Sequence, residues 1–294
     1  MLSGSFRPVK IAIFGIEGQL GRDLEIALSD FDVAPMLYAD VDIVDRTRVG
    51  DAVSAASPDW VINSAAMTHV DRCETQEKAA FEVNAEGARH VAEAAATTNA
   101  RLIHVSTDYV FDGKKGSPYV ESDVPRPLNV YGKTKLAGER FVGEVCPQHY
   151  IIRSSGLYGT HECWGKGTNF VETMLRLALD RNELKVVRDE VLTPTFTEDL
   201  AAQVRRLIET PPEYGVYHAT NEGQCSWFDF ATEIFCQTKT PIALEGISSK
   251  EWGAPAKRPA NSVLENAALK AAGSNVFPEW RDALQRYLSK RSTG

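Results

Sequence analysis

The chain has 294 residues, of which 43% are hydrophobic and 24% charged, as in an ordinary globular protein with a sizeable buried core. Its net charge of −8 at pH 7 and the lack of any Lys/Arg-rich run argue against a protein that binds nucleic acid through its phosphates. No run approaches the ~20 apolar residues of a membrane span, no apolar stretch of signal-peptide length begins the chain, and the cysteines lack zinc-ligand spacing, so we expect a cytoplasmic protein without a metal site.

Strand-like apolar runs alternate with helical stretches through the first half of the chain. The predicted strands are residues 9–14, 32–38, 59–66, 101–107 and 149–155. Pro35 weakens the second of them, because proline cannot donate to the hydrogen-bond ladder of a sheet. The alternation predicts a doubly wound, Rossmann-type α/β fold whose parallel sheet is covered by helices on both faces.

The pattern loosens after residue 155, where a glycine-rich loop and shorter helices follow. Thr195 and Glu198 have the spacing of a capping box at the start of a helix. Residues 215–220 are a further strand candidate.

The loss of regular alternation marks the expected domain boundary. We assign residues 1–155 to a dinucleotide-binding domain, with contributions from about residues 190–220. Residues 156–294 are assigned mainly to a smaller C-terminal α/β lobe that binds the substrate.

Three glycines, Gly15, Gly18 and Gly21, form the pattern G-x-x-G-x-x-G between the first predicted strand and the helix after it. Glycines in such a turn let the backbone approach a pyrophosphate, and the helix N-terminus offers free N–H groups and a positive dipole end. The position between strand and helix predicts a dinucleotide site, with a purely structural tight turn as the alternative.

The acidic residue expected on the adenine ribose is Asp40 or Asp42, near the end of the second predicted strand. No Lys or Arg lies between Arg22 and Arg46, so this stretch has no obvious clamp for a 2′-phosphate. The pattern favours NADH as the cofactor, and Arg22 leaves NADPH open.

The stretch NVYGKTKLAGE, residues 129–139, has a helical pattern and carries Tyr131 and Lys135 four positions apart. This spacing places both side chains on one face of a helix, one turn from each other. A nearby ammonium favours the phenolate form, so we expect Lys135 to lower the pKa of Tyr131. A surface contact without function fits the same spacing.

With the glycine loop and the strand-end STD at 106–108, the Tyr131/Lys135 pair makes the chain resemble the extended short-chain dehydrogenase/reductases. Further stretches between residues 14 and 264 are similar to the dTDP-4-dehydrorhamnose reductase family: FGIEGQLG, VINSAAMTHVDRCE, STDYVFDG, PLNVYGKTKLAGE, GTNF, TPT and KRPANSVL. The resemblance implies reduction of the C4 ketone of a dTDP-bound deoxyhexulose by NADPH or NADH, which gives dTDP-L-rhamnose.

Hydride transfer to a ketone develops negative charge on its oxygen, which needs a proton donor and hydrogen-bond support. Tyr131 is the expected acid, Thr107 brings a hydroxyl to the carbonyl oxygen, and the resemblance places Lys135 on the nicotinamide ribose. The resemblance also implies cofactor contacts by Gly15, Gly18, Gln19, Leu20, Gly21, Asp42, Ile43, Ala65, Ala66 and Thr68, and substrate contacts by Thr107, Asp108, Asn169 and Arg258.

Three departures from the family pattern fall on the substrate side. Gly156 stands where the family commonly has a tryptophan. The loop at 160–166 is longer and carries Trp164, either a substitute stacking platform or a surface aromatic. The family's DQxGxPT is DEVLTPT at 189–195, with Leu192 in place of a glycine. The reductase chemistry is therefore better supported than the identity of the sugar.

Other functions share parts of this pattern. A sugar-nucleotide 4,6-dehydratase needs a second carboxyl after Thr107 and Asp108, but Tyr109 stands there. A nucleotide-sugar epimerase stays open, as does a non-enzymatic subunit resembling the regulatory β subunit of methionine adenosyltransferase. For the reductase, the expected partner is a small nucleotide sugar. Many oxidoreductases of this size are homo-oligomers, and a homodimer is the candidate assembly.

Overall fold

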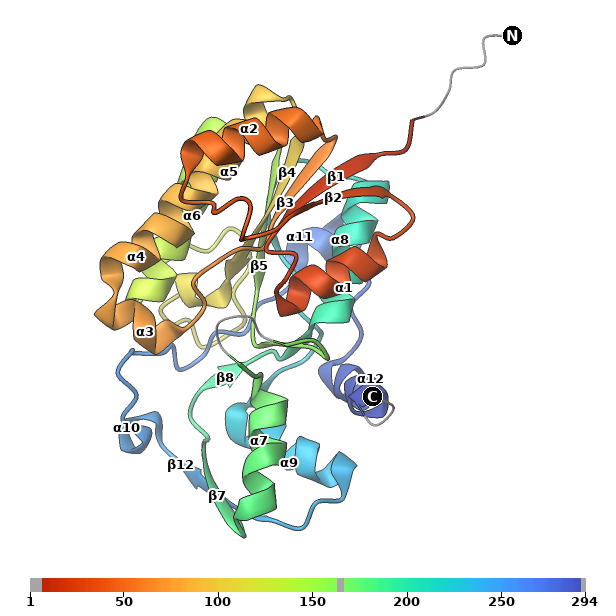
Figure 1. Cartoon of the computed structure of the whole chain (residues 1–294). Coiled ribbons are helices and arrows are strands. Elements are labelled where there is room, and N and C mark those ends of the chain that lie inside the picture. Colours follow the sequence, from red (N-terminus) through yellow and green to blue (C-terminus); the bar gives the residue numbers. More distant parts are fainter. Residues whose placement is uncertain (1–6, 163–166, 292–294) are drawn as a thin grey trace.

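The central sheet is the organising feature of the structure, a computed structural model that describes residues 7–162 and 167–291 (Figure 1). Six strands lie in the order β10-β5-β4-β3-β1-β2, and each neighbouring pair runs parallel. The predicted Rossmann-type sheet is confirmed, including the strand candidate near residue 215. The strands are β1 (Lys10–Phe14), β2 (Asp32–Met36), β3 (Trp60–Asn63), β4 (Arg101–Thr107), β5 (His149–Ser154) and β10 (Gly215–His218).

Pro35 lies in β2, which is an edge strand paired to β1 alone. One side of an edge strand has no ladder partner, so the missing N–H of proline leaves no bond unmade there. The strand ends at Met36, two residues before the predicted end at residue 38.

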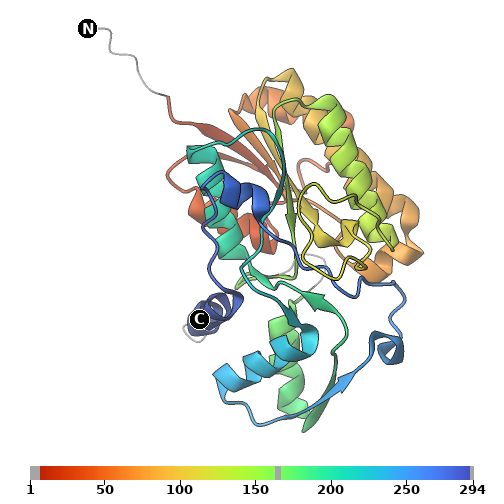
Figure 2. The same cartoon turned by 180° about the vertical axis from the view of Figure 1, so that it is seen from behind.

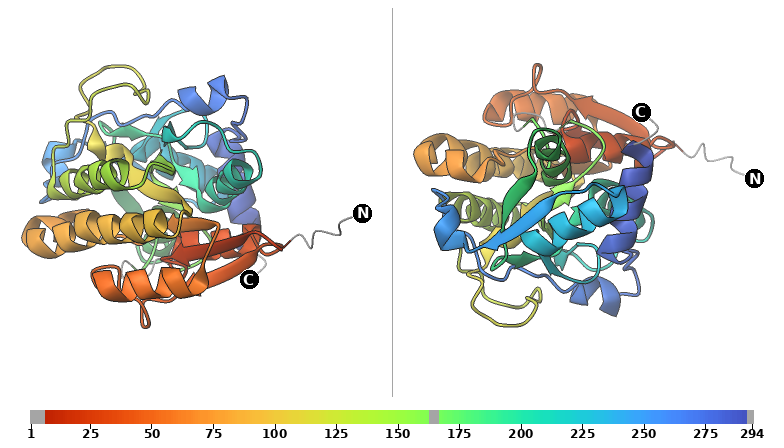
Figure 3. Two further views of the ribbon diagram at one scale, coloured as in Figure 1. Left: turned by 90° about the horizontal axis from the view of Figure 1, so that it is seen from above. Right: turned by 90° about the horizontal axis from the view of Figure 1, so that it is seen from below.

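Helices cover both faces of the sheet, as the view from above shows (Figure 3). Successive side chains of β1 point to opposite faces: Ile11 and Ile13 join one hydrophobic cluster, and Ala12 and Phe14 join the other. The first cluster is covered by α1 (Gln19–Ala27), α8 (Thr197–Glu209) and α11 (Ala267–Ala271), and the second by α2 (Arg46–Ala56), α5 (Ala88–Thr97) and α6 (Val130–Val145).

A smaller lobe lies beyond the carboxyl ends of the strands, at the bottom of Figures 1 and 2. Its own core is rich in aromatic residues, with Tyr158, Phe196, Phe230 and Trp280 all buried. The predicted second lobe is therefore present. Its elements are α7 (Phe170–Asp180), β7 (Glu183–Val187), α9 (Trp227–Thr238), β12 (Ala243–Ile247), α10 (Ser249–Trp252) and α12 (Trp280–Arg291), with β7 and β12 paired in parallel.

Short elements join the two parts of the chain. Between β3 and α5 lie α3 (Val70–Thr75), α4 (Glu77–Phe81) and η1 (Glu82–Gly87), and η2 (Asp108–Val110) follows β4. Two small sheets of two strands each also form: β6 (Leu157–Tyr158) pairs with β9 (Thr195–Phe196), and β8 (Val191–Leu192) pairs with β11 (Cys225–Ser226). In the described parts of the chain, no helix is long and apolar enough to cross a membrane.

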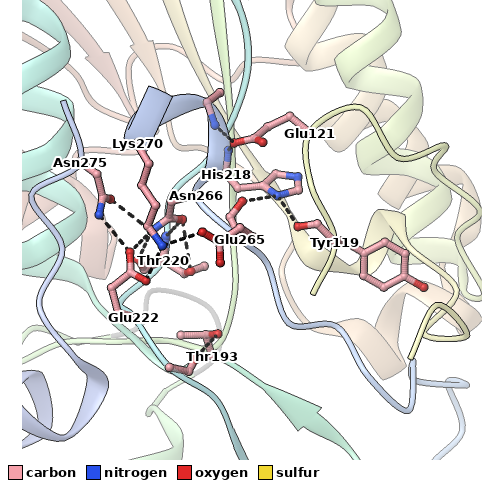
Figure 4. Close-up of polar contacts among 12 residues, drawn as sticks. Tyr119, Glu121, Thr193, His218, Thr220, Glu222, Glu265, Asn266, Lys270 and Asn275 are labelled. Atoms are coloured by element: carbon pink, nitrogen blue, oxygen red, sulfur yellow. Dashed lines mark hydrogen bonds and ion pairs between the residues drawn. The ribbon is translucent and has the colours of Figure 1, made fainter. Parts of the chain in front are cut away.

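The chain returns from the small lobe to the central sheet near its end. A ring nitrogen of buried His218, on β10, lies 3.0 Å from the Tyr119 carbonyl and 3.2 Å from that of Glu265 (Figure 4). The Asn266 amide donates to Thr220 O at 2.8 Å. Helix α8 and strand β10 fall within the predicted contribution of about residues 190–220 to the first domain, and α11, which was not predicted there, packs on the same side.

The capping box predicted at Thr195 and Glu198 is wrong. Thr195 is taken into β9, where it pairs with Leu157, so α8 begins two residues later, after Phe196, without a side-chain cap. Strand pairing has overridden the local spacing. A true capping box lies elsewhere, where Ser226 and Asp229 cap the start of α9.

Candidate active site

The predicted functional residues meet where the parallel strands end at their carboxyl edge, below the sheet in Figure 1. The glycine loop follows β1, Ala65 follows β3, and Thr107 ends β4. Ligands of open α/β sheets bind at this edge. Segments far apart in the sequence thus form one site.

The glycine loop is tight enough to require its glycines. Gly15 has a positive φ of 77°, and a Cβ there would lie 2.6 Å from Ala65 N. A Cβ on Gly21 would overlap the Gly15 carbonyl oxygen and lie 2.5 Å from Ile16 Cα. Gly18 precedes α1 and offers no side-chain cap, which leaves the first N–H groups of the helix free for an anion. The loop therefore fits a dinucleotide pyrophosphate.

Several predicted cofactor residues already have protein partners. The Gln19 amide donates to the carbonyls of Gly159 at 3.0 Å and His161 at 2.8 Å, so only its backbone is left for a pyrophosphate. Leu20 and Ile43 are buried in the core. The Asp42 carboxylate accepts from Val44 N at 3.1 Å.

The remaining predicted cofactor residues line the strand edge. Ala65 and Ala66 are half-buried and Thr68 is exposed. The Ala65 N–H donates to the side chain of Asn63, the last residue of β3, at 3.1 Å. The segment after β3 passes directly beside Gly15, so it and the glycine loop lie side by side at the predicted cofactor site.

Helix α6 brings the Tyr131/Lys135 pair to the end of β4. Asn129 caps the helix by accepting from Gly132 N at 2.8 Å. Gly132 permits the close approach of Tyr109, whose carbonyl oxygen occupies the space of a Cβ. The Tyr131 ring then meets the Tyr109 ring edge-on at 5.9 Å.

Thr107 and Asp108 form the polar end of β4. The Thr107 hydroxyl donates to Asp108 Oδ1 at 3.0 Å, and the Ser155 hydroxyl donates to Oδ2 at 2.8 Å. Burial raises the pKa of Asp108 to about 6, although hydrogen bonds from Ser262, Ser155 and Thr107 oppose the shift. Asp108 therefore fixes the orientation of the Thr107 hydroxyl in this structure.

The expectation that Lys135 lowers the pKa of Tyr131 is wrong for this structure. Burial raises the pKa of Tyr131 above its usual range, opposed by a hydrogen bond with Thr107. The Lys135 ammonium instead donates to the Val105 carbonyl at 2.6 Å. Burial lowers the pKa of Lys135 to about 8. Tyr131 is accordingly a protonated phenol at neutral pH.

The structure gives different results for Asn169 and Arg258, two of the predicted substrate contacts. Asn169 caps α7 through Glu172 N at 3.0 Å and donates to Gly159 O at 2.9 Å, so its observed role is structural. Arg258 is largely buried and donates to Asp71 Oδ2 at 3.1 Å. It also acts electrostatically on Tyr109, beside the catalytic residues. It is not a solvated surface arginine.

A small cavity lies beside Tyr109 and was not predicted as part of the site. Most of its lining falls in stretches quoted for the family resemblance, STDYVFDG and KRPANSVL, or in the altered DEVLTPT motif. Trp164, proposed as a stacking platform, lies outside the described residues. The cavity is lined by Tyr109, Glu190, Val191, Leu192, Trp227, Pro259 and Ser262.

Two departures from the family pattern pack against each other. Gly156 has a positive φ of 54°, and a Cβ there would lie 2.7 Å from Leu192 Cδ1. Leu192 is buried and lines the cavity. A larger residue at 156 would have to displace the Leu192 side chain, so we expect the two positions to be coupled.

We expect Gly156→Ala to lower the free energy of unfolding by about 1–3 kcal/mol, through backbone strain and overpacking. Leu192→Ala leaves a cavity and costs about 2–5 kcal/mol by itself. Urea unfolding of both single variants and the double variant measures their coupling. The double variant should lose less than the two singles combined, by at least about 0.5 kcal/mol. Additive losses would contradict the coupling.

Glu190 predicts a pH dependence of stability. Burial raises its pKa to about 7 from an ordinary 4.5, opposed by Arg258. Between these pH values the native state binds more protons than the unfolded state, so this group's contribution to stability falls as pH rises. Glu190→Gln should therefore become more stable than wild type above pH 7, by on the order of 2 kcal/mol, while the difference shrinks toward pH 4.5. Urea unfolding across this range measures it. The exposed Glu144→Gln is the control and should show a difference that does not change with pH.

The chain matches the family described as the RmlD substrate binding domain over residues 9–293. It belongs to this family. Among curated relatives, the spore coat polysaccharide biosynthesis protein SpsK of Bacillus subtilis is 39% identical, covering 97% of this chain and 98% of the relative. The dTDP-4-dehydrorhamnose reductase of Escherichia coli is 36% identical, covering 97% and 99%.

Solved structures of RmlD-family members agree with this assignment. The dTDP-4-dehydrorhamnose reductase of Bacillus anthracis in complex with NADP has a TM-score of 0.92 at 38% identity, covering 97% of this chain and 100% of that chain. The UDP-glucose 4-epimerase of Thermus thermophilus shares the fold at 17% identity and a TM-score of 0.81, covering 97% and 99%. The predicted family and an oxidoreductase of the NAD(P)H-dependent class are confirmed.

Proposed function

We propose that this RmlD-family protein reduces the C4 ketone of dTDP-4-dehydro-L-rhamnose to give dTDP-L-rhamnose, with Tyr131 as the proton donor. The observation that carries the proposal is the meeting of Thr107, Tyr131 and Lys135 at the end of β4, next to the glycine loop. The same reaction is named for relatives that match nearly the whole chain.

The chemistry divides between the bound nucleotide and the chain. A reduced nicotinamide, when bound, supplies the hydride. Burial keeps the Tyr131 phenol protonated, so it has a proton to give to the oxygen that becomes negative. The Thr107 hydroxyl has one proton, which it donates to Asp108 in this structure, so it would turn from Asp108 to add hydrogen-bond support at the same oxygen. Lys135 is the residue that would hold the nicotinamide ribose.

Both NADPH and NADH are proposed as hydride donors. The end of β2 favours NADH, because the carboxylate of Glu17 accepts from Tyr38 N at 2.7 Å and puts negative charge where a 2′-phosphate would add more. Arg22, the nearest preceding cation in the sequence, is paired with Glu25 at 3.0 Å. A homodimer stays a prediction.

A spectrophotometric assay at 340 nm tests the proposal. Purified protein is mixed with dTDP-4-dehydro-L-rhamnose generated in situ, and NADPH and NADH are compared. We expect loss of absorbance, with dTDP-L-rhamnose formed in equal amount. An epimerase would convert the sugar without net loss of absorbance. Nucleotide binding with no turnover would contradict the proposal and favour the regulatory-subunit alternative.

A further inference from the structure

Glu139 is a buried carboxylate next to the catalytic residues, with only 4% of its surface exposed. It lies one turn after Lys135 on α6, on the same face of the helix. It accepts from the Ser106 hydroxyl at 2.5 Å, and from Arg153 Nε at 3.0 Å and Nη2 at 2.7 Å. The mechanism proposed above does not use it.

The partners of Glu139 show where it acts. Ser106 on β4 and Arg153 on β5 face each other directly in the sheet. The Glu139 carboxylate therefore accepts hydrogen bonds from both strands. These bonds lie one residue before Thr107 on β4 and its sheet partner Ser154 on β5. On the preceding turn of α6, Lys135 is fastened to the Val105 carbonyl at 2.6 Å. Helix α6 is thus hydrogen-bonded to Val105 and Ser106, the two residues of β4 just before Thr107.

The polar groups around Lys135 come from four elements. On its own helix, Glu139 favours the ammonium form. On β4, buried His104 has a pKa held well below its usual range, first by burial and then by Lys135, so it carries no charge at neutral pH. On β5, Arg153 is held by Glu139. From η1, uncharged Asn84 faces the helix through Thr134.

Two further titratable groups, Asp108 and Cys73, act electrostatically on Tyr131. Burial raises the pKa of both the carboxyl and the thiol. Glu139 is the anion that acts on Lys135 and offsets the cost of burying its ammonium.

We propose that Glu139 is a positioning residue whose charge keeps Lys135 protonated at neutral pH. Its bonds to Ser106 and Arg153 hold that charge under the end of β4. Only the catalytic consequence of this role rests on the proposed function; the protonation of Lys135 is a property of the chain alone.

The test is a titration of Lys135 in the nucleotide-free protein. The 13Cε resonance of the lysine, assigned with Lys135→Met, is followed against pH by NMR in wild type and in Glu139→Gln. We expect the midpoint of Lys135 to fall by about one pH unit or more in Glu139→Gln. This readout is independent of any activity, so it stands whether or not the sugar is reduced.

Two further variants separate charge from architecture. Glu139→Gln leaves the Arg153 cation buried without its partner, a strongly destabilising change, so Glu139→Gln/Arg153→Met removes both charges and should fold. The Lys135 midpoint of this double variant should lie above that of Glu139→Gln, because the Arg153 cation is removed as well. Arg153→Met alone should raise the midpoint, because it removes a cation and leaves the anion. A wild-type midpoint in Glu139→Gln, or a double-variant midpoint no higher than that of Glu139→Gln, would overturn the proposal.

Discussion

Replacing Tyr131 with phenylalanine is expected to lower kcat by about 10²–10⁴-fold, the range for loss of a general acid. The dissociation constant for NADPH should change by less than about threefold, because the ring and its edge-on contact with Tyr109 at 5.9 Å remain. Stopped-flow or steady-state assays at 340 nm measure the first quantity, and quenching of protein fluorescence by the nucleotide measures the second.

The buried environment of Tyr131 gives this prediction its direction. Its raised pKa keeps the phenol protonated, so the wild type has its acid available throughout the neutral range. Lys135, whose pKa burial lowers to about 8, is the group that loses its proton first as pH rises. The activity of the wild type should therefore decline above about pH 8, through Lys135 rather than Tyr131.

Tyr150→Phe is the matched control for Tyr131→Phe. Tyr150 is a buried tyrosine of β5, and its hydroxyl donates to the Pro212 carbonyl at 2.9 Å. Loss of this bond should cost about 1 kcal/mol of stability and leave kcat unchanged. Comparable loss of kcat in both variants would show that removing any buried phenol disturbs the site, and would contradict a proton-donor role.

The sequence predicted the sheet well because its signals are local. Strands β1 and β3 contain continuous apolar runs, and the glycine triplet stands directly between β1 and α1. Thr107, Tyr131 and Lys135 were found for a related reason: a strand end and a helix face fix their positions. Pro35 weakened the prediction of β2, and the structure shows that β2 is an edge strand, where proline is tolerated.

What the sequence did not predict depends on contacts between distant segments. The Asn169 amide reads as a sugar ligand, but Gly159 and Glu172 occupy it. The Thr195 hydroxyl has the spacing of a helix cap, but strand pairing with Leu157 removes it from the helix. The coupling of Gly156 to Leu192 spans 36 positions and is visible only as a Cβ that would lie 2.7 Å from the leucine.

Replacing Gly21 with alanine should abolish tight nucleotide binding. A methyl group there overlaps the Gly15 carbonyl oxygen and lies 2.5 Å from Ile16 Cα, both of which belong to the backbone. Backbone cannot rotate away as a flexible side chain does, so the loop must open. The hydrogen bond from Gly18 N to Gly15 O, 3.0 Å long, depends on the same tight turn.

We expect Gly21→Ala to lose at least about tenfold in NADPH affinity and about 1–3 kcal/mol in the free energy of unfolding. Gly50→Ala is the matched control, because Gly50 lies inside α2 and a Cβ there meets nothing within 4 Å. It should bind nucleotide normally and gain up to about 1 kcal/mol from better helix propensity. Fluorescence titration and urea unfolding measure both quantities. Wild-type affinity in Gly21→Ala would show that the glycine loop is a structural turn and that the pyrophosphate binds elsewhere.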